Sequence, residues 1–510
     1  MRAHTVHSFL TLACGIALTV TPGWASSQEL YRLIDLGTLG GSSSRGDAIN
    51  SAGQICGGSS IADSSEGHAF FWDGKTMQDL GTLGSSIGCD EINAAGQVTG
   101  TGFLPGAGSN HAYVWDGATF KVLGTLGGTN SRAAAINSSG LVVGSADVAD
   151  FQEHAFLWDG TTMRDLGTLG GLESEARDIN ANGQVTGFAL GPKGVRAFLW
   201  NGTGMKDLGT LGGTNSAGNA INASGHVTGR ADISGGGWHA YIWNGTSMED
   251  LGTLEGAISE VSEGSAINAL GQVTGSSSNA QGFERAFLWD GNRMRNLGNL
   301  GGRYSRGTGI NDFAVVIGTA SLPEGDPQQQ VFRPFVSIGG AKMKNLNEVI
   351  DPSDPLKSRV ELFEASDVNN RGQISATGRD SRTFATHAYL VTPLQYKIAF
   401  TAPTTGSAWK QGTTVPIKIR LVDVNGERIS DSRAASLVAM PCKVKFSAKG
   451  AQPRTAVCMK YDANANLFYI NWKLGTSSAG ATTLTVAATY KFSMPETITT
   501  KRSRTITITQ

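Results

Sequence analysis

A phrase of residues that recurs along most of the chain constrains the fold more than any other feature. In its fullest form it reads Ile179-Asn180, Gly183-Gln-Val-Thr-Gly187, Arg196-Ala-Phe-Leu-Trp200-Asn-Gly202 and Asp207-Leu-Gly-Thr-Leu-Gly-Gly213. Its closing Leu-Gly segment follows Asp35, Asp79, Val122, Asp165, Asp207, Asp250 and Asn296, with a weaker copy at Asn345. A fixed period of this length indicates a repeat architecture.

Each copy of the phrase contains four strand patterns. The first ends in Ile-Asn, the second is Gly-Gln-Val-Thr-Gly, the third ends in Trp and the fourth ends in Asp-Leu-Gly. An Asp-Gly or Asn-Gly pair, such as Asp73-Gly74 or Asn201-Gly202, separates the last two strands and is typical of a hairpin turn. Four antiparallel strands in one repeat predict the blade of a β-propeller.

The two ends of the repeat region are complementary. Residues Leu30 to Leu36 read as a fourth strand that has no first three. The last unit has Val368-Asn369 and His387 to Leu390 but lacks a fourth strand. Pairing these segments would close a ring and remove two exposed sheet edges. We therefore expect an eight-bladed propeller. A seven-bladed ring is the alternative, because Arg333-Pro-Phe-Val336 departs from the usual third strand.

The N-terminus has the pattern of a secretory signal peptide at residues 1–25. Arg2 supplies positive charge, Phe9 to Val20 is apolar, and small residues precede the cleavage site that we expect after Ala25. The apolar run is shorter than the ~20 residues that a membrane span needs. These features predict a secreted protein, periplasmic or extracellular, without a membrane span.

Cysteines in such a compartment are expected to form disulfides. Cys442 and Cys458 are close in the sequence, so a local bond between them is expected. Cys56 and Cys89 fall in neighbouring repeats. They either pair with each other or remain two small buried side chains.

The region from 396 to 510 differs from the repeats in charge and pattern. It holds 16 Lys and Arg against 5 Asp and Glu, whereas the remaining residues hold 25 against 37. Its alternating apolar segments predict an immunoglobulin-like β-sandwich. Residues 26–392 would form the propeller, and Thr392 to Gln395 would be a linker. The basic charge predicts weak binding of polyanions, with no specific nucleic-acid partner.

The repeated phrase resembles the HAF family of extracellular bacterial repeats over roughly residues 31–391, because the His-Ala-Phe wording of residues 68–70 recurs with the surrounding segments in order. This resemblance implies secretion and a propeller-like fold, and it implies no reaction. Residues 400–403 with 412–421 resemble the secreted Pro-x-Lys-Phe module, although Ile419 stands where that module has phenylalanine.

Two sets of repeated side chains are interpreted as structural. One set, at the start of the third strand, is His68, His111, His154, His239 and His387. Arg196 and Arg285 take the same place, and an arginine does not replace a metal ligand, so no metal site and no cofactor are expected. The other set is expected to pack between blades: Trp72, Trp115, Trp158, Trp200, Trp243 and Trp289.

The candidate binding residues lie outside the repeated phrase. Segments after the second and fourth strands vary between units, and in a propeller both emerge on the same face, where variable loops favour ligand binding. The aromatic and acidic candidates in these segments are Phe103, Phe151, Trp238, Phe283, Asp147, Asp150, Glu153, Asp232 and Glu284. No nucleophile elbow, zinc-protease motif or calcium loop is present, so no catalytic residue is assigned.

These features together favour a secreted bacterial binding, adhesion or scaffold protein. We expect it to be a monomer that recognises an extracellular polysaccharide or protein through one propeller face. A carbohydrate-active hydrolase or lyase with two carboxylates at the axis is one alternative. A structural matrix protein is another.

Overall fold

The computed structural model describes residues 31–63, 66–84, 87–323 and 330–394, and after them 397–402, 408–410, 414–422, 444–449, 457–462, 467–473, 480–490 and 498–509. The segment 1–25, which we interpret as a signal peptide, lies outside these ranges. The described residues form strands and turns without a helix, which confirms the all-β class. Within the same ranges, therefore, there is no long apolar helix of the kind that crosses a membrane.

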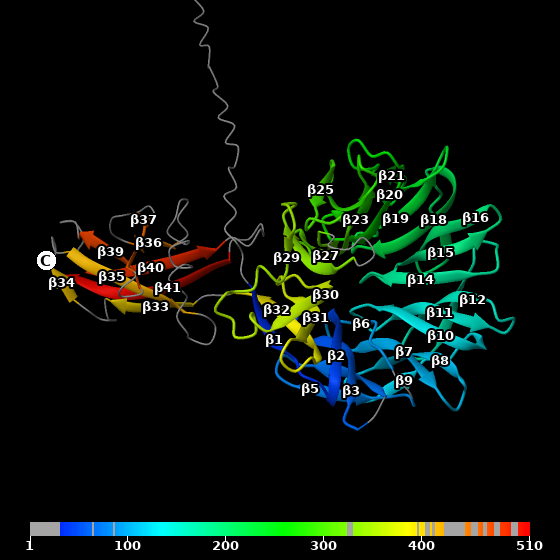
Figure 1. The fold of residues 1–510 in the computed structure, drawn as a ribbon, viewed down its shortest axis with the longest axis horizontal. Helices are drawn as coiled ribbons and strands as arrows, with labels where there is room; N and C mark the ends of the chain where they lie inside the picture. The colour runs from blue at the N-terminus through cyan, green and yellow to red at the C-terminus, as the bar shows by residue number, and fades with distance from the viewer. Residues whose placement is uncertain are drawn as a thin grey trace, which may run out of the picture.

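Six copies of the phrase each form one four-stranded antiparallel sheet, and the sheets follow one another around a ring in a propeller-like fold (Figure 1). The strands are β6 (Glu91–Ile92), β7 (Val98–Leu104), β8 (Ser109–Trp115), β9 (Phe120–Val122); β10 (Gly127–Ile136), β11 (Val142–Val148), β12 (Glu153–Trp158), β13 (Met163–Gly167); β14 (Ser174–Ile179), β15 (Val185–Gly191), β16 (Gly194–Trp200), β17 (Met205–Asp207); β18 (Gly212–Ile221), β19 (Val227–Ile233), β20 (Trp238–Trp243), β21 (Met248–Asp250); β22 (Ser262–Ile267), β23 (Val273–Ser278), β24 (Glu284–Trp289), β25 (Met294–Gly298); β26 (Ser305–Ile310), β27 (Val315–Ser321), β28 (Phe332–Ile338) and β29 (Lys344–Asn345).

The first and last units share one eight-stranded sheet. It contains β2 (Gly40–Ile49), β3 (Ile55–Ile61), β4 (Gly67–Trp72) and β5 (Met77–Gly81) from the first unit, and β30 (Val360–Val368), β31 (Ile374–Asp380) and β32 (Thr386–Pro393) from the last. A parallel contact between Ser43 and Thr386 joins the two halves. β1 (Tyr31–Asp35) pairs antiparallel with β32, which agrees with the expectation that the chain start supplies the missing fourth strand.

Eight buried asparagines form a closed ring of hydrogen bonds. Each is the Asn that follows the first strand of its unit, and its Nδ2 donates to the backbone carbonyl of the next Asn at 2.9–3.1 Å. The ring runs through Asn50, Asn93, Asn137, Asn180, Asn222, Asn268, Asn311 and Asn369, and from Asn369 back to Asn50. Buried amides and carbonyls require such partners, so the ring couples every unit to its neighbours.

A repeated serine makes a second connection between neighbouring units. The Ser44 hydroxyl donates to the Gly37 carbonyl oxygen at 2.6 Å and accepts the Ala388 N–H of the last unit at 2.9 Å. The same pair of bonds recurs at Ser131, Ser174, Ser216, Ser262 and Ser305. A single hydroxyl thereby satisfies one buried acceptor and one buried donor.

The repeated tryptophans pack at the contacts between sheets, as the sequence predicts. Trp72, Trp115, Trp158, Trp200 and Trp243 are buried. A cation of the preceding unit covers three of these rings: Lys121 lies 4.8 Å from the Trp158 ring centre, Arg164 lies 5.1 Å from that of Trp200, and Lys206 lies 4.4 Å from that of Trp243. Such contacts add cation–π attraction to the burial of the rings.

Cys56 and Cys89 form a disulfide between the first and second units, with their Cα atoms 6.0 Å apart. Of the two alternatives for these cysteines, the structure therefore has the bonded pair. The bond expected between Cys442 and Cys458 is not described, because Cys442 lies outside the described residues.

The C-terminal part forms two further sheets. One contains β33 (Lys397–Ala402), β35 (Thr414–Val422), β39 (Leu467–Lys473) and β38 (Lys460–Asp462). The other contains β34 (Ala408–Lys410), β41 (Ile498–Thr509), β40 (Gly480–Tyr490), β36 (Val444–Lys449) and β37 (Val457–Cys458). β33 lies against β40 and β41, so the two sheets are in contact.

One expected boundary needs correction. The sequence places Thr392 and Pro393 in the linker, but they are the last residues of β32 and pair with Arg32 and Tyr31. Proline has no N–H to donate, and it is accommodated here because the strand ends at Pro393.

Candidate functional site

The two edges of each sheet in the ring differ. Because neighbouring strands are antiparallel, the turns after the first and third strands lie at one edge, and the connections after the second and fourth strands lie at the other. We call the side of the ring that carries the turns after the first and third strands the turn edge, and the opposite side, at the other ends of the strands, the loop edge. At the turn edge the ring asparagines close the first turn; the Oδ1 of Asn180, for example, accepts the N–H groups of Asn182 and Gln184, both at 3.0 Å. The turn edge is therefore built alike from unit to unit.

The second turn at this edge is held by an Asp or Asn side chain. Asp159 accepts the N–H groups of Thr161 and Thr162 at 2.9 Å, and these bonds hold the pKa of the Asp159 carboxyl below its ordinary value. Asp73 and Asp116 make the same pattern. These carboxylates stabilise the turns by accepting backbone N–H groups.

The loop edge carries most of the strongly exposed apolar side chains of the described ring. Phe151 is 77% exposed, Ile258 72%, Phe384 67% and Leu172 61%, and all four lie in connections at this edge. At the turn edge, Leu270 is exposed to a similar degree, 69%. All four loop-edge residues lie on the same side of the ring, in connections that vary between units, and variable exposed loops favour ligand binding.

Both phenylalanines of this group have a strained backbone. Phe151 has a φ of 60° and Phe384 a φ of 59°, in the left-handed region that bulky residues avoid. Each lies in a connection between the second and third strands of its unit. Strain of this kind costs about 1–3 kcal/mol and is concentrated at functional sites.

The aromatic candidates from the sequence all lie at the loop edge, but in different sheets. Phe103 is partly exposed in β7. Trp238 begins β20, and the Arg230 guanidinium lies 5.6 Å from its ring centre. The Phe283 ring lies between Arg285 and Arg303, at 5.6 and 5.5 Å. The structure thus spreads Phe103, Phe151, Trp238 and Phe283 around the ring and does not bring them into one pocket.

Two acidic candidates are engaged within their own sheets. Asp147 accepts hydrogen bonds from Asn130 and Thr129, which lower the pKa of its carboxyl against the opposing effect of burial. Asp232 accepts the same bonds from Asn215 and Thr214. Both therefore fix the Gly-Gly-Thr-Asn segment of the unit.

The remaining acidic candidates are placed differently. Glu153 accepts a bond from the Ser145 hydroxyl at 2.5 Å. Asp150 is exposed beside Phe151, and Glu284 is the first residue of β24.

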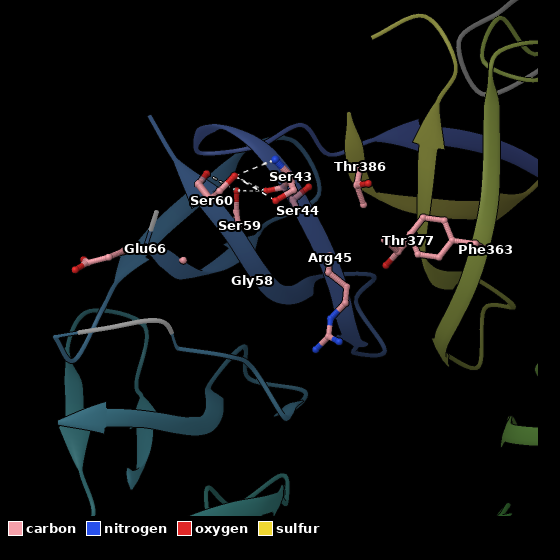
Figure 2. Close-up of a pocket in the computed structure, with 11 residues that line it drawn as sticks. Ser43, Ser44, Arg45, Gly58, Ser59, Ser60, Glu66, Phe363, Thr377 and Thr386 are labelled. Atoms are coloured by element: carbon pink, nitrogen blue, oxygen red, sulfur yellow. Dashed lines mark hydrogen bonds between the residues drawn. The ribbon is translucent and has the colours of Figure 1, made fainter. Parts of the chain in front are cut away.

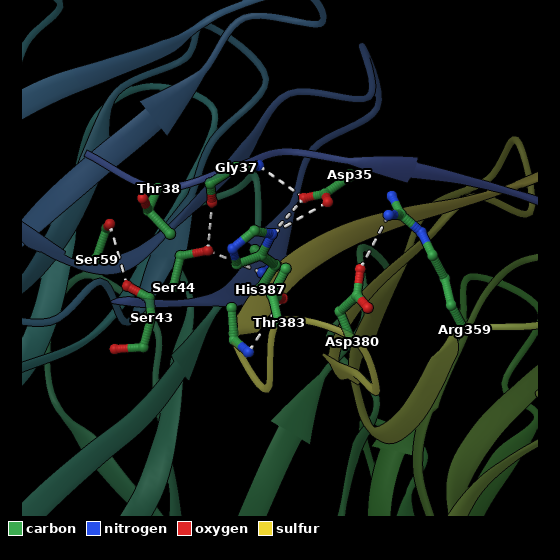
Figure 3. Close-up of polar contacts among 12 residues, drawn as sticks. Asp35, Gly37, Thr38, Ser43, Ser44, Ser59, Arg359, Asp380, Thr383 and His387 are labelled. Carbon is green, nitrogen blue, oxygen red and sulfur yellow. Dashed lines mark hydrogen bonds and ion pairs between the residues drawn. The ribbon is translucent and has the colours of Figure 1, made fainter. Parts of the chain in front are cut away.

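Four of the five repeated histidines pair with the aspartate of the Asp-Leu-Gly segment, whereas His111, whose unit has Val122 in that place, contacts the Ser109 hydroxyl. The Nδ1 atoms of His68, His154, His239 and His387 lie 2.8–2.9 Å from Asp79, Asp165, Asp250 and Asp35. Figure 3 shows the pair His387–Asp35, which ties β32 to β1 beside the bond from Ser44 to Gly37. The Asp35 hydrogen bond raises the pKa of His387, against the opposing effect of burial. This pairing gives these four histidines a structural role.

A cleft of about 430 Å³ opens at the seam between the first and last units (Figure 2). Six of its residues bear hydroxyl groups, and none of the nine candidates from the sequence lines it. The lining residues are Ser43, Ser44, Arg45, Gly58, Ser59, Ser60, Glu66, Gly67, Phe363, Thr377 and Thr386.

Phe363 enters this cleft because β30 is irregular there. Leu362 pairs with Gly378 and Glu364 pairs with Thr377, so Phe363 is an extra residue in the ladder. A bulge of this kind redirects side chains and is common beside functional sites. The Phe363 ring is 39% exposed, and Figure 2 shows it with Thr377 across the opening from Arg45.

Arg45 is the cation of the cleft. Its side chain is 59% exposed, and its Nε lies 2.8 Å from the Oδ1 of Asp47. Within the described ranges the two terminal guanidinium nitrogens form no hydrogen bond. Burial raises the pKa of Asp47 to about 7, although the neighbouring Arg45 opposes this shift.

Three partly exposed carboxyl groups connect sheets near the asparagine ring. Glu91 accepts the Ile136 N–H at 2.9 Å, Asp178 accepts that of Ile221 at 2.7 Å, and Asp367 accepts that of Ile49 at 3.0 Å. Burial raises the pKa of Glu91 to about 8 and that of Asp178 to about 6, and it also raises the pKa of Asp367. In the described part of the chain no group of three His, Cys, Asp or Glu side chains is arranged to hold a metal ion.

Sequence reasoning missed the cleft and the asparagine ring. The Ile-Asn ending occurs in seven units, with Val368-Asn369 in the last. A local turn is enough to explain the asparagine, so the pattern gives no sign of its partner in the next unit. Phe363 gives a weaker signal, because the last unit reads Val360-Glu-Leu-Phe-Glu-Ala365 where six other units have the repeated serine.

No family model and no curated protein sequence matches the chain. Solved structures to which the chain has a distant similarity include TolB from Acinetobacter baumannii (15% identity, TM-score 0.31, covering 48% of this chain and 61% of that one) and a puromycin-hydrolysing peptidase of Mycobacterium tuberculosis (12%, 0.39, 67% and 58%). A triple arginine-to-alanine mutant of AofleA from Arthrobotrys oligospora is a third (11%, 0.29, 62% and 90%). The chain thus spans less than two thirds of the length of the first two structures, and these distant likenesses indicate no activity.

Proposed function

We propose that this chain is a secreted bacterial binding or adhesion protein that recognises an extracellular polysaccharide through the loop edge of its ring, with an extracellular protein as the alternative ligand. The observation that carries the proposal is the difference between the two edges. The first turn of the turn edge is built alike in all eight units, whereas the loop edge presents Phe151, Leu172, Ile258 and Phe384 to solvent. A rigid frame that holds variable exposed side chains on one side suits recognition.

The proposal includes an eight-bladed propeller followed by an immunoglobulin-like sandwich. The eight asparagines of the closed ring support eight blades over seven, because the irregular unit of β26–β29 contributes Asn311 like the others. The two sheets in contact after residue 396 support the sandwich. The resemblance to HAF repeats and to the Pro-x-Lys-Phe module supports secretion.

Of the alternatives, a glycoside hydrolase or lyase is less favoured. It would need two reachable carboxylates near the axis. Glu91, Asp178 and Asp367 are only partly exposed, and each is engaged by accepting a backbone N–H of the next unit. A matrix protein without a specific ligand would give no reason for phenylalanine at the left-handed turn positions of Phe151 and Phe384, where another unit has Gly282.

The test is binding of residues 26–510 to a glycan array and to cell-surface extracts. Phe151→Asn and Phe384→Asn change the loop edge, and Leu270→Asn is the matched control at the turn edge. We expect the loop-edge variants to lose ligand and the control to retain it. No bound ligand with the parent protein, or equal loss in all three variants, contradicts the proposal.

A further inference from the structure

We propose that the cleft at the seam binds the carboxylated sugar of an anionic polysaccharide, that is, a uronic acid residue. The inference rests on the proposed function and specifies the site and the ligand class. It depends on three features of the cleft: an uncommitted guanidinium fork, a redirected aromatic ring and a lining of hydroxyl groups.

The guanidinium of Arg45 supplies the charge. Its Nε is paired with Asp47, and its terminal nitrogens remain as donors at an exposed position. Two other arginines near the axis differ, because Arg306 is paired with Glu263 at 2.6 Å and Arg177 is bonded to Glu175 and Asn219. A planar guanidinium with two free nitrogens matches the two oxygens of a carboxylate.

Phe363 supplies an apolar surface opposite this charge. The bulge between Leu362 and Glu364 brings its ring into the cleft, and the ring remains partly exposed. The C–H face of a pyranose ring is an apolar surface that can lie on an aromatic face. The cleft volume of about 430 Å³ falls within the range of small-ligand sites, roughly 300–1,000 Å³.

Hydroxyl groups complete the site. The Thr377 Oγ1 is buried without a hydrogen-bond partner in the described part of the chain. An unpartnered buried hydroxyl is unfavourable, and a sugar hydroxyl could both donate to it and accept from it. The lining hydroxyls of Ser43, Ser59 and Ser60 lie in one connected group. This hydroxyl lining favours a sugar over an acidic peptide, which would use the guanidinium but not the remaining groups.

The experiment is titration calorimetry of the full chain with tetragalacturonate, with its methyl ester as the uncharged analogue and tetraglutamate as the acidic peptide. The variants are Arg45→Gln and Phe363→Ala. The matched control is Arg132→Gln, because Arg132 is also exposed, occupies the corresponding position in β10 and does not line the cleft. Thermal unfolding checks that each variant is folded.

We expect tetragalacturonate to bind, its methyl ester to bind less, and Arg45→Gln to weaken binding roughly ten- to a hundredfold, as for loss of a charged hydrogen bond. Phe363→Ala should also weaken it, and Arg132→Gln should not. Binding that is unchanged in both cleft variants, or tetraglutamate that binds as tightly as the saccharide, overturns the inference. If the array still shows other glycans bound, the proposed function survives that result; if it shows none, both fail.

Discussion

Asn369 donates a hydrogen bond of 2.9 Å from its Nδ2 to the backbone carbonyl of Asn50, although the two residues are 319 positions apart. The bond completes the ring of eight asparagines and joins the end of the repeat region to its beginning. β1 on β32 and the Ser44 hydroxyl on Ala388 make the same connection elsewhere in the seam. Ring closure therefore rests on three independent sets of contacts.

Replacing a ring asparagine should destabilise the protein. Asn369→Ala removes the donor to the buried Asn50 carbonyl and the acceptor for two turn N–H groups. Leaving a buried polar group unpaired costs about 1–3 kcal/mol. Urea unfolding measures the loss. Asn182→Ala is the control, because the exposed Asn182 amide also donates a hydrogen bond to the next unit. The loss of stability in this variant should be near zero. An equal loss of unfolding free energy in the two variants would show that the asparagine ring stabilises the protein no more than an exposed hydrogen bond does.

The disulfide between Cys56 and Cys89 should contribute to stability. The two residues are 33 positions apart, and a loop of this length corresponds to about 3–4 kcal/mol. We expect the double variant Cys56→Ala, Cys89→Ala to melt well below the parent protein, and a reductant to lower the melting temperature of the parent alone. If the reductant lowers the melting temperature of both proteins equally, its effect does not come from this disulfide.

Stability should fall as the pH rises from about 5 to about 8. The folded protein holds the pKa of Asp47 at about 7 and that of Glu91 at about 8, above their ordinary values of 3.8 and 4.5. Within this window the folded state keeps protons that the unfolded chain has lost, so raising the pH favours unfolding. His387 acts in the same direction, because its pKa is also raised and its paired, charged form is lost as the pH increases.

Differential scanning calorimetry at pH 5.5 and 8.5 measures this dependence. Glu91→Gln keeps an oxygen acceptor for the Ile136 N–H and removes the titrating group, so its melting temperature should vary less with pH than that of the parent. A melting temperature that rises from pH 5.5 to 8.5 is incompatible with the raised pKa values.

The strained loop-edge phenylalanines should be unfavourable for folding. Asparagine adopts the left-handed region more readily than a bulky residue, so Phe151→Asn and Phe384→Asn should each stabilise the protein by about 1 kcal/mol. Chemical unfolding checks this, with Leu270→Asn, where no strain is relieved, as the comparison. Lower stability of both variants would mean that these side chains serve folding and not recognition.

The sequence predicts the architecture well because its signals are local. The Asp-Gly pairs, the Trp-ending third strands and the constant period each define one unit without knowledge of the others. Closure of the ring by Tyr31 to Asp35 is also predictable, because this segment reads as a fourth strand without its unit and the last unit is the one that lacks a fourth strand. Boundaries were harder to predict: Pro393 looks like a linker residue and instead ends a paired strand.

The candidate site was less accessible to sequence reasoning. Asp147 and Asp232 look like variable loop acids, yet each fixes a Thr-Asn segment that appears only in the same units. Arg45 and Phe363 are distant in the sequence, and only the pairing of β2 with β32 brings their strands to one seam. The bulge that directs Phe363 into the cleft depends on strand register, which the repeat pattern does not encode at this irregular unit.

Amide hydrogen exchange followed by mass spectrometry tests the closed ring most directly. If the N-terminal strand completes the last sheet, peptides covering 31–36 and 386–393 should exchange together and as slowly as the strands of the complete sheets. Exchange of 31–36 within seconds, while 386–393 and the other sheets stay protected, would show that β1 is not part of the ring and would contradict the account.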